Sequence, residues 1–140
     1  MFNPSRDDAR KFFFESWRKF QVKEVLTPLE DMTAQLIGRH PEYHSIFENP
    51  DRYQDHDYQP EQGDTNPFLH LMMHLSLEEQ ISIDQPVGVR NHFTRLTQKL
   101  GSEHDAHHQM MDCLGEMILQ AQRNKTQPDA TIYLNCLEKQ

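Results

Sequence analysis

Histidine pairs one helical turn apart are the residues of this 140-residue chain whose spacing could do chemistry. His70 and His74, followed by Glu78, recur every four residues, which places the three side chains on one stripe of a helix. Two imidazoles on adjacent turns, with a carboxylate one turn further, can converge on a single metal ion. The segment around them is apolar on nearly every other side, and polar groups buried there would need a hydrogen-bond partner or a metal. The spacing therefore indicates metal ligands on this segment.

A second segment repeats the same arrangement. His104 and His108 are followed at the same spacing by Asp112 and Glu116, along one border of an apolar helix face. His107 projects closer to the centre of that face, so on its position alone it is a rival ligand. Two helices that each carry a histidine pair and trailing carboxylates resemble the way helical bundles build metal sites from facing side chains.

A third histidine pair brackets a predicted helix break at Pro41, and it could supply a further arm of the site. The main predicted ligands are His70, His74, His104 and His108; Glu78 and Glu116 are ligands or hydrogen-bond acceptors of ligands, and His40 and His44 are next in line. Imidazole and carboxylate without a thiolate pattern suit a first-row divalent ion, namely zinc, iron, nickel or manganese.

The elements that must position these residues are predicted to be helices. Apolar residues recur at helical spacing in residues 5–21, from Thr27 to the break at Pro41, and in residues 67–82, 87–100, 102–124 and 128–138. No alternating run indicates a strand. The expected fold is all-α: a small single-domain bundle of five or six helices over residues 1–140, with a long polar loop at about 49–65.

Charge and composition narrow the function classes. The chain has 14 Lys and Arg against 22 Asp and Glu, a net charge of −8, which disfavours nucleic-acid binding. No apolar run is long enough to span a membrane, and the first residues lack the pattern of a signal peptide, so a cytoplasmic location is expected. Cys113 and Cys136 have no CxxC spacing and are predicted to be unpaired. No nucleotide or flavin motif is present.

Several segments resemble a bacterial family known only as domain of unknown function 1841. The resemblance rests on Asn3-Pro4-Ser5 with Phe13 and Trp17, His40-Pro41-Glu42-Tyr43-His44, Asn66-Pro67-Phe68-Leu69-His70 continuing to His74 and Glu78-Glu79-Gln80, Ile83-Asp84-Gln85-Pro86 with Gly88, His104, His108, Leu114-Gly115-Glu116 and Ala121-Gln122-Arg123. It spans nearly the whole chain and implies a soluble bacterial protein, without implying an activity. It also favours His104 and His108 over His107 as the pair that belongs to the pattern.

Two functions of different classes follow from these residues. The first is a metal-binding helical bundle, whose ion could act on an unknown small molecule if it keeps a coordination position open. The second is a non-enzymatic interaction or scaffolding module with a structural histidine network. Its working surface would be the 49–65 loop or an exposed aromatic face of the first helix, and its partner could be a second copy of the chain. A pH-responsive role of clustered histidines ranks behind both.

Overall fold

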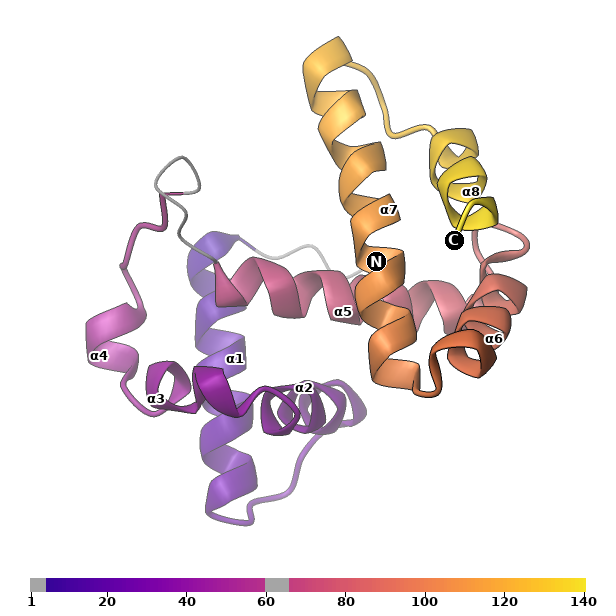
Figure 1. Cartoon of the computed structure of the whole chain (residues 1–140). Coiled ribbons are helices and arrows are strands. Elements are labelled where there is room, and N and C mark those ends of the chain that lie inside the picture. Colours follow the sequence, from indigo (N-terminus) through magenta and orange to yellow (C-terminus); the bar gives the residue numbers. More distant parts are fainter. Residues whose placement is uncertain (1–4, 60–65) are drawn as a thin grey trace. The chain divides into compact units, whose positions relative to one another are not determined.

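A computed structural model of the chain describes residues 5–59 and 66–140, and every regular element in these ranges is helical (Figure 1). The all-α prediction is confirmed, but the described residues form eight α-helices rather than five or six. In chain order the α-helices are α1 (Arg6–Gln21), α2 (Pro28–Gly38), α3 (His44–Phe47), α4 (Pro50–Tyr53), α5 (Pro67–Ile83), α6 (Val89–Leu100), α7 (Glu103–Asn124) and α8 (Ala130–Glu138). A 3₁₀ turn, η1 (Pro41–Tyr43), lies between α2 and α3.

The additional helices are α3 and α4, which follow the predicted break at Pro41. Each is only four residues long, too short for an apolar period to be visible in the sequence. The predicted loop at 49–65 therefore contains helix α4, and the part of it at residues 60–65 lies outside the described residues.

The chain divides into two units, Met1–Met72 and Met73–Gln140. The division falls within α5, so the first turns of this helix belong to unit 1 and the remainder to unit 2. The expectation that residues 1–140 form one domain stays a prediction.

Unit 1 is built around aromatic rings. In this unit α1 packs against α2, and the centroids of neighbouring rings of Phe13, Phe14, Phe47 and Phe68 lie 5.4 to 6.4 Å apart. Trp17 is buried as well, at 5% exposure. Phe13, Phe14 and Trp17 of the first helix are therefore core, whereas Phe20 on the same helix is 41% exposed.

Side-chain caps explain where the longer helices begin. The Ser5 hydroxyl accepts a hydrogen bond from the backbone N–H of Asp8 and starts α1. Thr27 and Glu30 form a reciprocal capping box at the start of α2. Helix α5 begins just after Asn66. The side chain of Asn66 accepts from two backbone N–H groups, and Thr65 lies outside the described residues.

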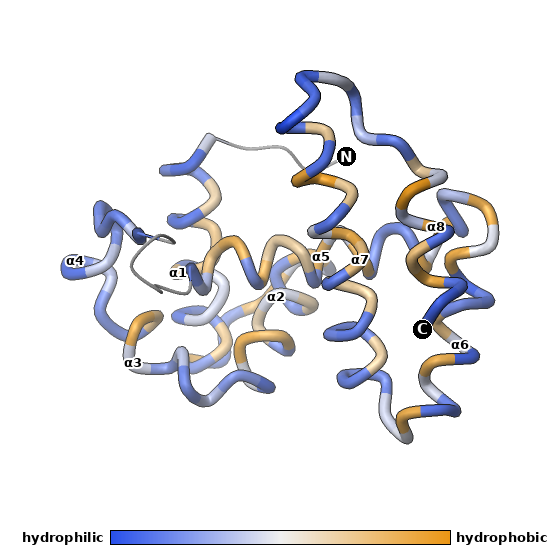
Figure 2. Tube along the Cα trace, turned by 45° about the horizontal axis from the view of Figure 1, so that its top comes forward, coloured by the Kyte–Doolittle hydropathy of each residue, from blue (hydrophilic) through white to orange (hydrophobic). Residues whose placement is uncertain are grey.

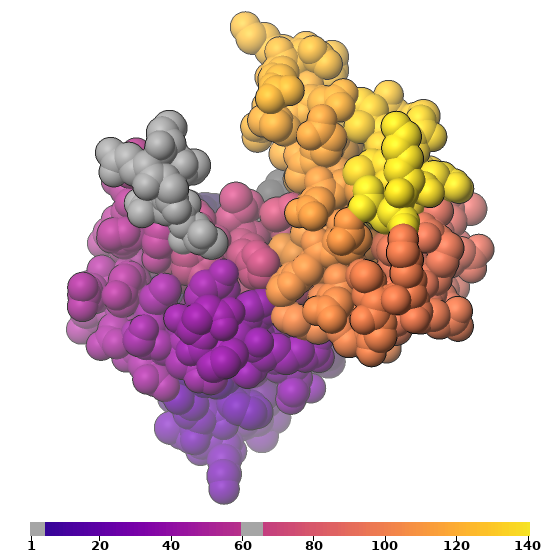
Figure 3. Space-filling view, viewed as in Figure 1, coloured from indigo at the N-terminus to yellow at the C-terminus, as the bar shows by residue number. Residues whose placement is uncertain are grey.

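Unit 2 combines the last turns of α5 with α6, α7 and α8. Its core is mainly aliphatic, with Met110, Met111 and the fully buried Tyr133, and α8 packs against α7, as the yellow and orange atoms of Figure 3 show. Hydrophobic residues recur along α5 and on α8 in Figure 2. The prediction of unpaired cysteines is wrong, because a disulfide between Cys113 and Cys136 joins α7 to α8. Two apolar helix positions give no spacing signal for this pairing, because it depends on the packing of α7 and α8, which brings the two Cα atoms to 5.5 Å.

None of the helices in the described part of the chain combines the length and the apolar composition that crossing a membrane requires.

Candidate metal centre

His74 stands in the most apolar part of α5. Its side chain is fully buried, and Leu71, Leu75 and Leu77 on the same helix are buried as well. An imidazole at such a position loses its contact with water, and it needs polar partners to compensate for that loss. His74, as a fully buried imidazole, is therefore the central residue of the candidate site in unit 2.

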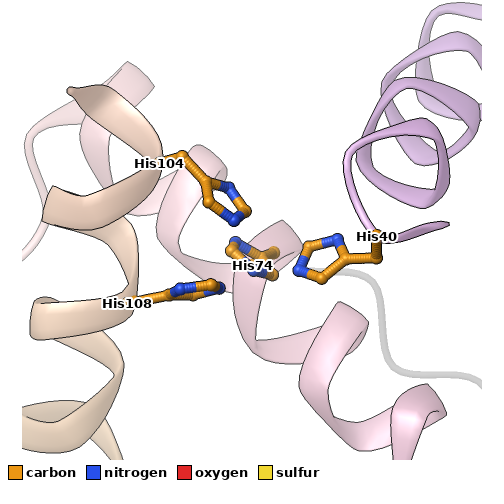
Figure 4. Close-up of side chains that lie close together, drawn as sticks. All are labelled: His40, His74, His104 and His108. Carbon is orange, nitrogen blue, oxygen red and sulfur yellow. The ribbon is translucent and has the colours of Figure 1, made fainter. Parts of the chain in front are cut away.

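Helix α7 brings two further imidazoles to His74. The hydroxyl of Ser102 accepts from the backbone N–H of Asp105 and starts the helix, so that His104 and His108 occupy its first two turns. Figure 4 shows both rings projecting from α7 toward His74. The ring centroid of His74 lies 5.6 Å from that of His104 and 5.0 Å from that of His108. The three side chains therefore gather at one point between α5 and α7.

The ring nitrogens of this trio approach the separation that a metal requires. His74, His104 and His108 each offer one nitrogen, and these nitrogens lie within 4.8 Å of one another. Ligand nitrogens at about 2.0–2.1 Å from a tetrahedral ion are roughly 3.3 Å apart, so the nitrogens of the trio would draw closer together on binding an ion. Figure 4 also labels His40, which belongs to unit 1.

His107, the predicted rival ligand, contacts both His74 and Glu78. Its Nδ1 lies 3.1 Å from Nδ1 of His74, within hydrogen-bond distance, and its Nε2 lies 3.4 Å from the carboxylate of Glu78. His107 is 3% exposed, so the helical-wheel expectation that it is the deeper residue is confirmed. The predicted site residue Glu78 thus lies beside His107, whose imidazole can donate a hydrogen bond to the carboxylate.

Two of the predicted site residues, His40 and His70, lie in unit 1. His40 is buried and its Nδ1 donates to the backbone oxygen of Leu36 over 2.7 Å. Its Nε2 lies 3.2 Å from Nε2 of His70, and its ring stacks on Tyr43 at a centroid distance of 5.4 Å. Burial, followed by the charge of the neighbouring Glu42, raises the pKa of Tyr43, so this phenol stays neutral beside the two imidazoles.

The remaining two predicted residues make local contacts. In unit 1 the Nε2 of His44 donates to the backbone oxygen of Ile37 over 2.9 Å, and its ring lies 4.7 Å from that of Trp17. In unit 2 Glu116 is exposed and accepts a hydrogen bond from the side chain of Gln120. The i, i+12 stripe from His104 to Glu116 therefore does not extend the trio, because twelve residues of helix span about 18 Å.

The sequence pattern does not by itself predict that His107 contacts both His74 and Glu78. The i, i+4 spacing of His74 and Glu78 was visible, and so was the inward position of His107. Only the packing of α7 against α5 places the His107 ring between the other two side chains.

Fold and site together define an all-helical protein that carries a cluster of buried and half-buried histidines between two helices of its second unit. The chain matches the family described as Domain of unknown function (DUF1841) over residues 5–139, which is nearly its whole length, and it belongs to this family. No curated protein and no solved structure matches the chain.

Proposed function

We propose that the chain binds a first-row divalent metal ion through His74, His104 and His108. The observation that carries the proposal is the gathering of one nitrogen from each of these imidazoles within 4.8 Å. His74 comes from α5 and the other two from α7, so two rigid helices hold the ligand set. Sites built on helices keep their ligands at defined positions, as metal coordination demands.

The chemistry of the ligands narrows the identity of the ion. Imidazole nitrogens suit zinc, nickel and iron, whereas manganese prefers oxygen ligands. Thiolate coordination has no part in the proposal, because both cysteines are held in the disulfide. Of the four ions expected from the sequence, zinc, nickel and iron therefore fit the trio better than manganese does.

Three protein ligands leave at least one position of a tetrahedral ion for water or another ligand, the arrangement found in catalytic zinc sites. Metal binding is the proposed function. Chemistry on a small molecule would be an extension of it that requires a substrate to reach this position.

The rival function, an interaction module with structural histidines, has less support. Its discriminating feature was exposure of Phe12, Phe13, Phe14 and Trp17; the last three are buried and Phe12 is half-buried. What remains of this alternative is the 49–65 loop as its working surface, together with a histidine network that braces α5 against α7, and this is the conclusion to draw if no metal binds.

The disulfide bears on where such a protein would work. Disulfides persist mainly in oxidising compartments and are rare in a reducing cytoplasm. The bond between Cys113 and Cys136 therefore counts against the cytoplasmic location expected from the sequence, which stays a prediction.

The test is metal analysis of the full chain purified without a histidine tag, followed by zinc titration against a chromophoric chelator. We expect one zinc per chain. Replacing two ligands together, His74→Ala with His108→Ala, should weaken zinc binding by more than the roughly 100-fold that loss of an outer hydrogen-bond partner costs.

The matched control is His92→Gln. This histidine lies in the same unit, on α6, where its nearest carboxylate is that of Glu138 at 3.7 Å. Its replacement should leave the zinc affinity unchanged. Zinc binding that is absent in the natural chain, or that survives the double replacement undiminished, would refute the proposal.

A further inference from the structure

The contacts of His107 suggest a task for this residue that metal binding alone does not assign. Its ring lies in hydrogen-bond contact with one proposed ligand, His74, on one side and faces the carboxylate of Glu78 on the other. All three side chains belong to unit 2, and His107 itself is almost completely buried. Its ring is further packed edge-on against Phe93, at a centroid distance of 5.5 Å.

The positions of the hydrogens follow from the chemistry of the partners. An ionised carboxylate only accepts hydrogen bonds, so the His107 Nε2 that faces Glu78 carries a hydrogen. In a neutral imidazole the other nitrogen is then an acceptor. The hydrogen between the two rings therefore belongs to Nδ1 of His74, which donates to Nδ1 of His107 over 3.1 Å.

This donation decides which nitrogen of His74 can meet a metal. A ring nitrogen that carries a hydrogen cannot coordinate, and a neutral imidazole carries only one. With the hydrogen on Nδ1, the lone pair of His74 is on Nε2. Histidines that bind metals almost always donate their other N–H to a carboxylate, a carbonyl or a water, and this partner fixes both tautomer and ring orientation.

We propose that His107 and Glu78 form a positioning relay that holds His74 in the Nδ1–H tautomer and so presents its Nε2 as the metal ligand. The inference rests on the proposed metal-binding function. His107 is in this account a positioning residue and not a ligand, which resolves its rivalry with the pair His104 and His108. A neutral imidazole in this place does for His74 what a carboxylate does in many metal sites.

The first measurement needs no metal. Nitrogen-15 spectra of the metal-free chain, with the imidazoles assigned by single histidine replacements, report which nitrogen of His74 carries the hydrogen. We expect Nδ1–H in the natural chain and in His107→Gln, whose amide oxygen can still accept from His74. We expect the Nε2–H form to appear in His107→Leu, which offers no acceptor.

The second measurement is zinc affinity. His107→Leu should bind zinc about 10- to 100-fold more weakly than the natural chain, which is the usual cost of losing such a partner. His107→Gln should recover most of this loss while the number of imidazoles at the zinc, counted by X-ray absorption, stays the same. Rescue by Gln separates positioning from ligation, because a ligand imidazole would be lost in both variants.

The two proposals fail in different ways. If the natural chain binds no zinc but shows Nδ1–H on His74, the metal-binding function is refuted and the relay stands as a structural device. If His74 carries its hydrogen on Nε2 in the natural chain, or if His107→Gln removes an imidazole from the bound zinc, the relay is refuted whatever the zinc affinity.

Discussion

The two units of the molecule differ in how far their buried polar side chains are directed at backbone oxygens. In unit 1 the buried Arg10 donates to the backbone oxygens of Tyr53, Gln54 and His56, and His40 donates to that of Leu36 while its other ring nitrogen lies 3.2 Å from His70. In unit 2 the histidine His74 makes its hydrogen-bond contact with another imidazole, that of His107. A donor bound to a carbonyl braces one segment against another, whereas nitrogens gathered at one point offer lone pairs to an ion.

The pairs His40/His44 and His104/His108 show how little the spacing alone decides. Both are i, i+4 pairs in the sequence. Pro41 breaks the first pair out of a continuous helix, and its rings donate to backbone oxygens four and seven residues earlier in the chain. The second pair stands on an unbroken helix with its rings 4.2 Å apart, beside His74. Residue type and spacing are the same in the two pairs. The continuity of the helix is what distinguishes the pair that binds backbone oxygens from the pair that lies beside His74.

The largest expected effect comes from the aromatic core of unit 1. Phe13→Ala removes a fully buried ring that packs on Phe47 and Phe68, and it should lower the free energy of unfolding by about 3 to 5 kcal/mol. Chemical denaturation measures this change. Zinc stoichiometry of the folded variant should match that of the natural chain, and a loss of zinc here would break the contrast between the units.

A somewhat smaller effect is expected at the disulfide of unit 2. Replacing Cys113 and Cys136 together by Ala removes a crosslink with a sequence separation of 23, which should lower the free energy of unfolding by about 3 kcal/mol. The increase in melting temperature on adding zinc should persist, because neither cysteine is a proposed ligand. Free thiols in the natural protein, detected by alkylation and mass measurement without reductant, would contradict the assignment of this bond.

A direct test of the contrast between the histidine pairs uses one member of each. His44→Ala breaks a hydrogen bond to Ile37 and a ring contact with Trp17, and it should cost about 1 kcal/mol of stability without a change in zinc affinity. His108→Ala should do the reverse and weaken zinc binding more than it affects the metal-free fold. Equal effects of the two replacements on zinc binding would mean that the units do not differ as described.

The smallest expected effect is a pH dependence in unit 1. The backbone N–H of Thr27, followed by the side chain of Lys19, holds the pKa of Glu30 below its usual value. A lowered folded-state pKa stabilises the fold above the unfolded-state pKa, and the contribution is lost as the pH falls through the folded-state value. The stability difference between the natural chain and Glu30→Gln should therefore shrink on acidification below about pH 4. A difference that grows instead would contradict this cause.

Local chemistry explains which parts of this structure could be predicted. Helix caps and proline breaks act within a few residues, so they can be recognised in the sequence. The caps at Ser5, Asn66 and Ser102 and the break at Pro41 mark where the longer helices begin or end. The one-turn helices α3 and α4 were missed because they have no period to detect.

The candidate site could be predicted only up to the helix faces that carry it. Helical spacing identified His74, His104 and His108, because the histidine stripe of each segment is a property of one helix. Which residues meet across two helices depends on the angle and register of packing, and the sequence does not state these. This is why Glu116 was included although it is exposed, and why the disulfide and the place of His107 were missed.

X-ray absorption spectroscopy of the zinc-loaded full chain tests the central claim most directly. The account predicts at least three imidazole nitrogens about 2.0–2.1 Å from the zinc, and one fewer in His108→Ala. A zinc ion surrounded mainly by oxygen, or a number of imidazoles that does not fall in this variant, would contradict a metal centre built from His74, His104 and His108.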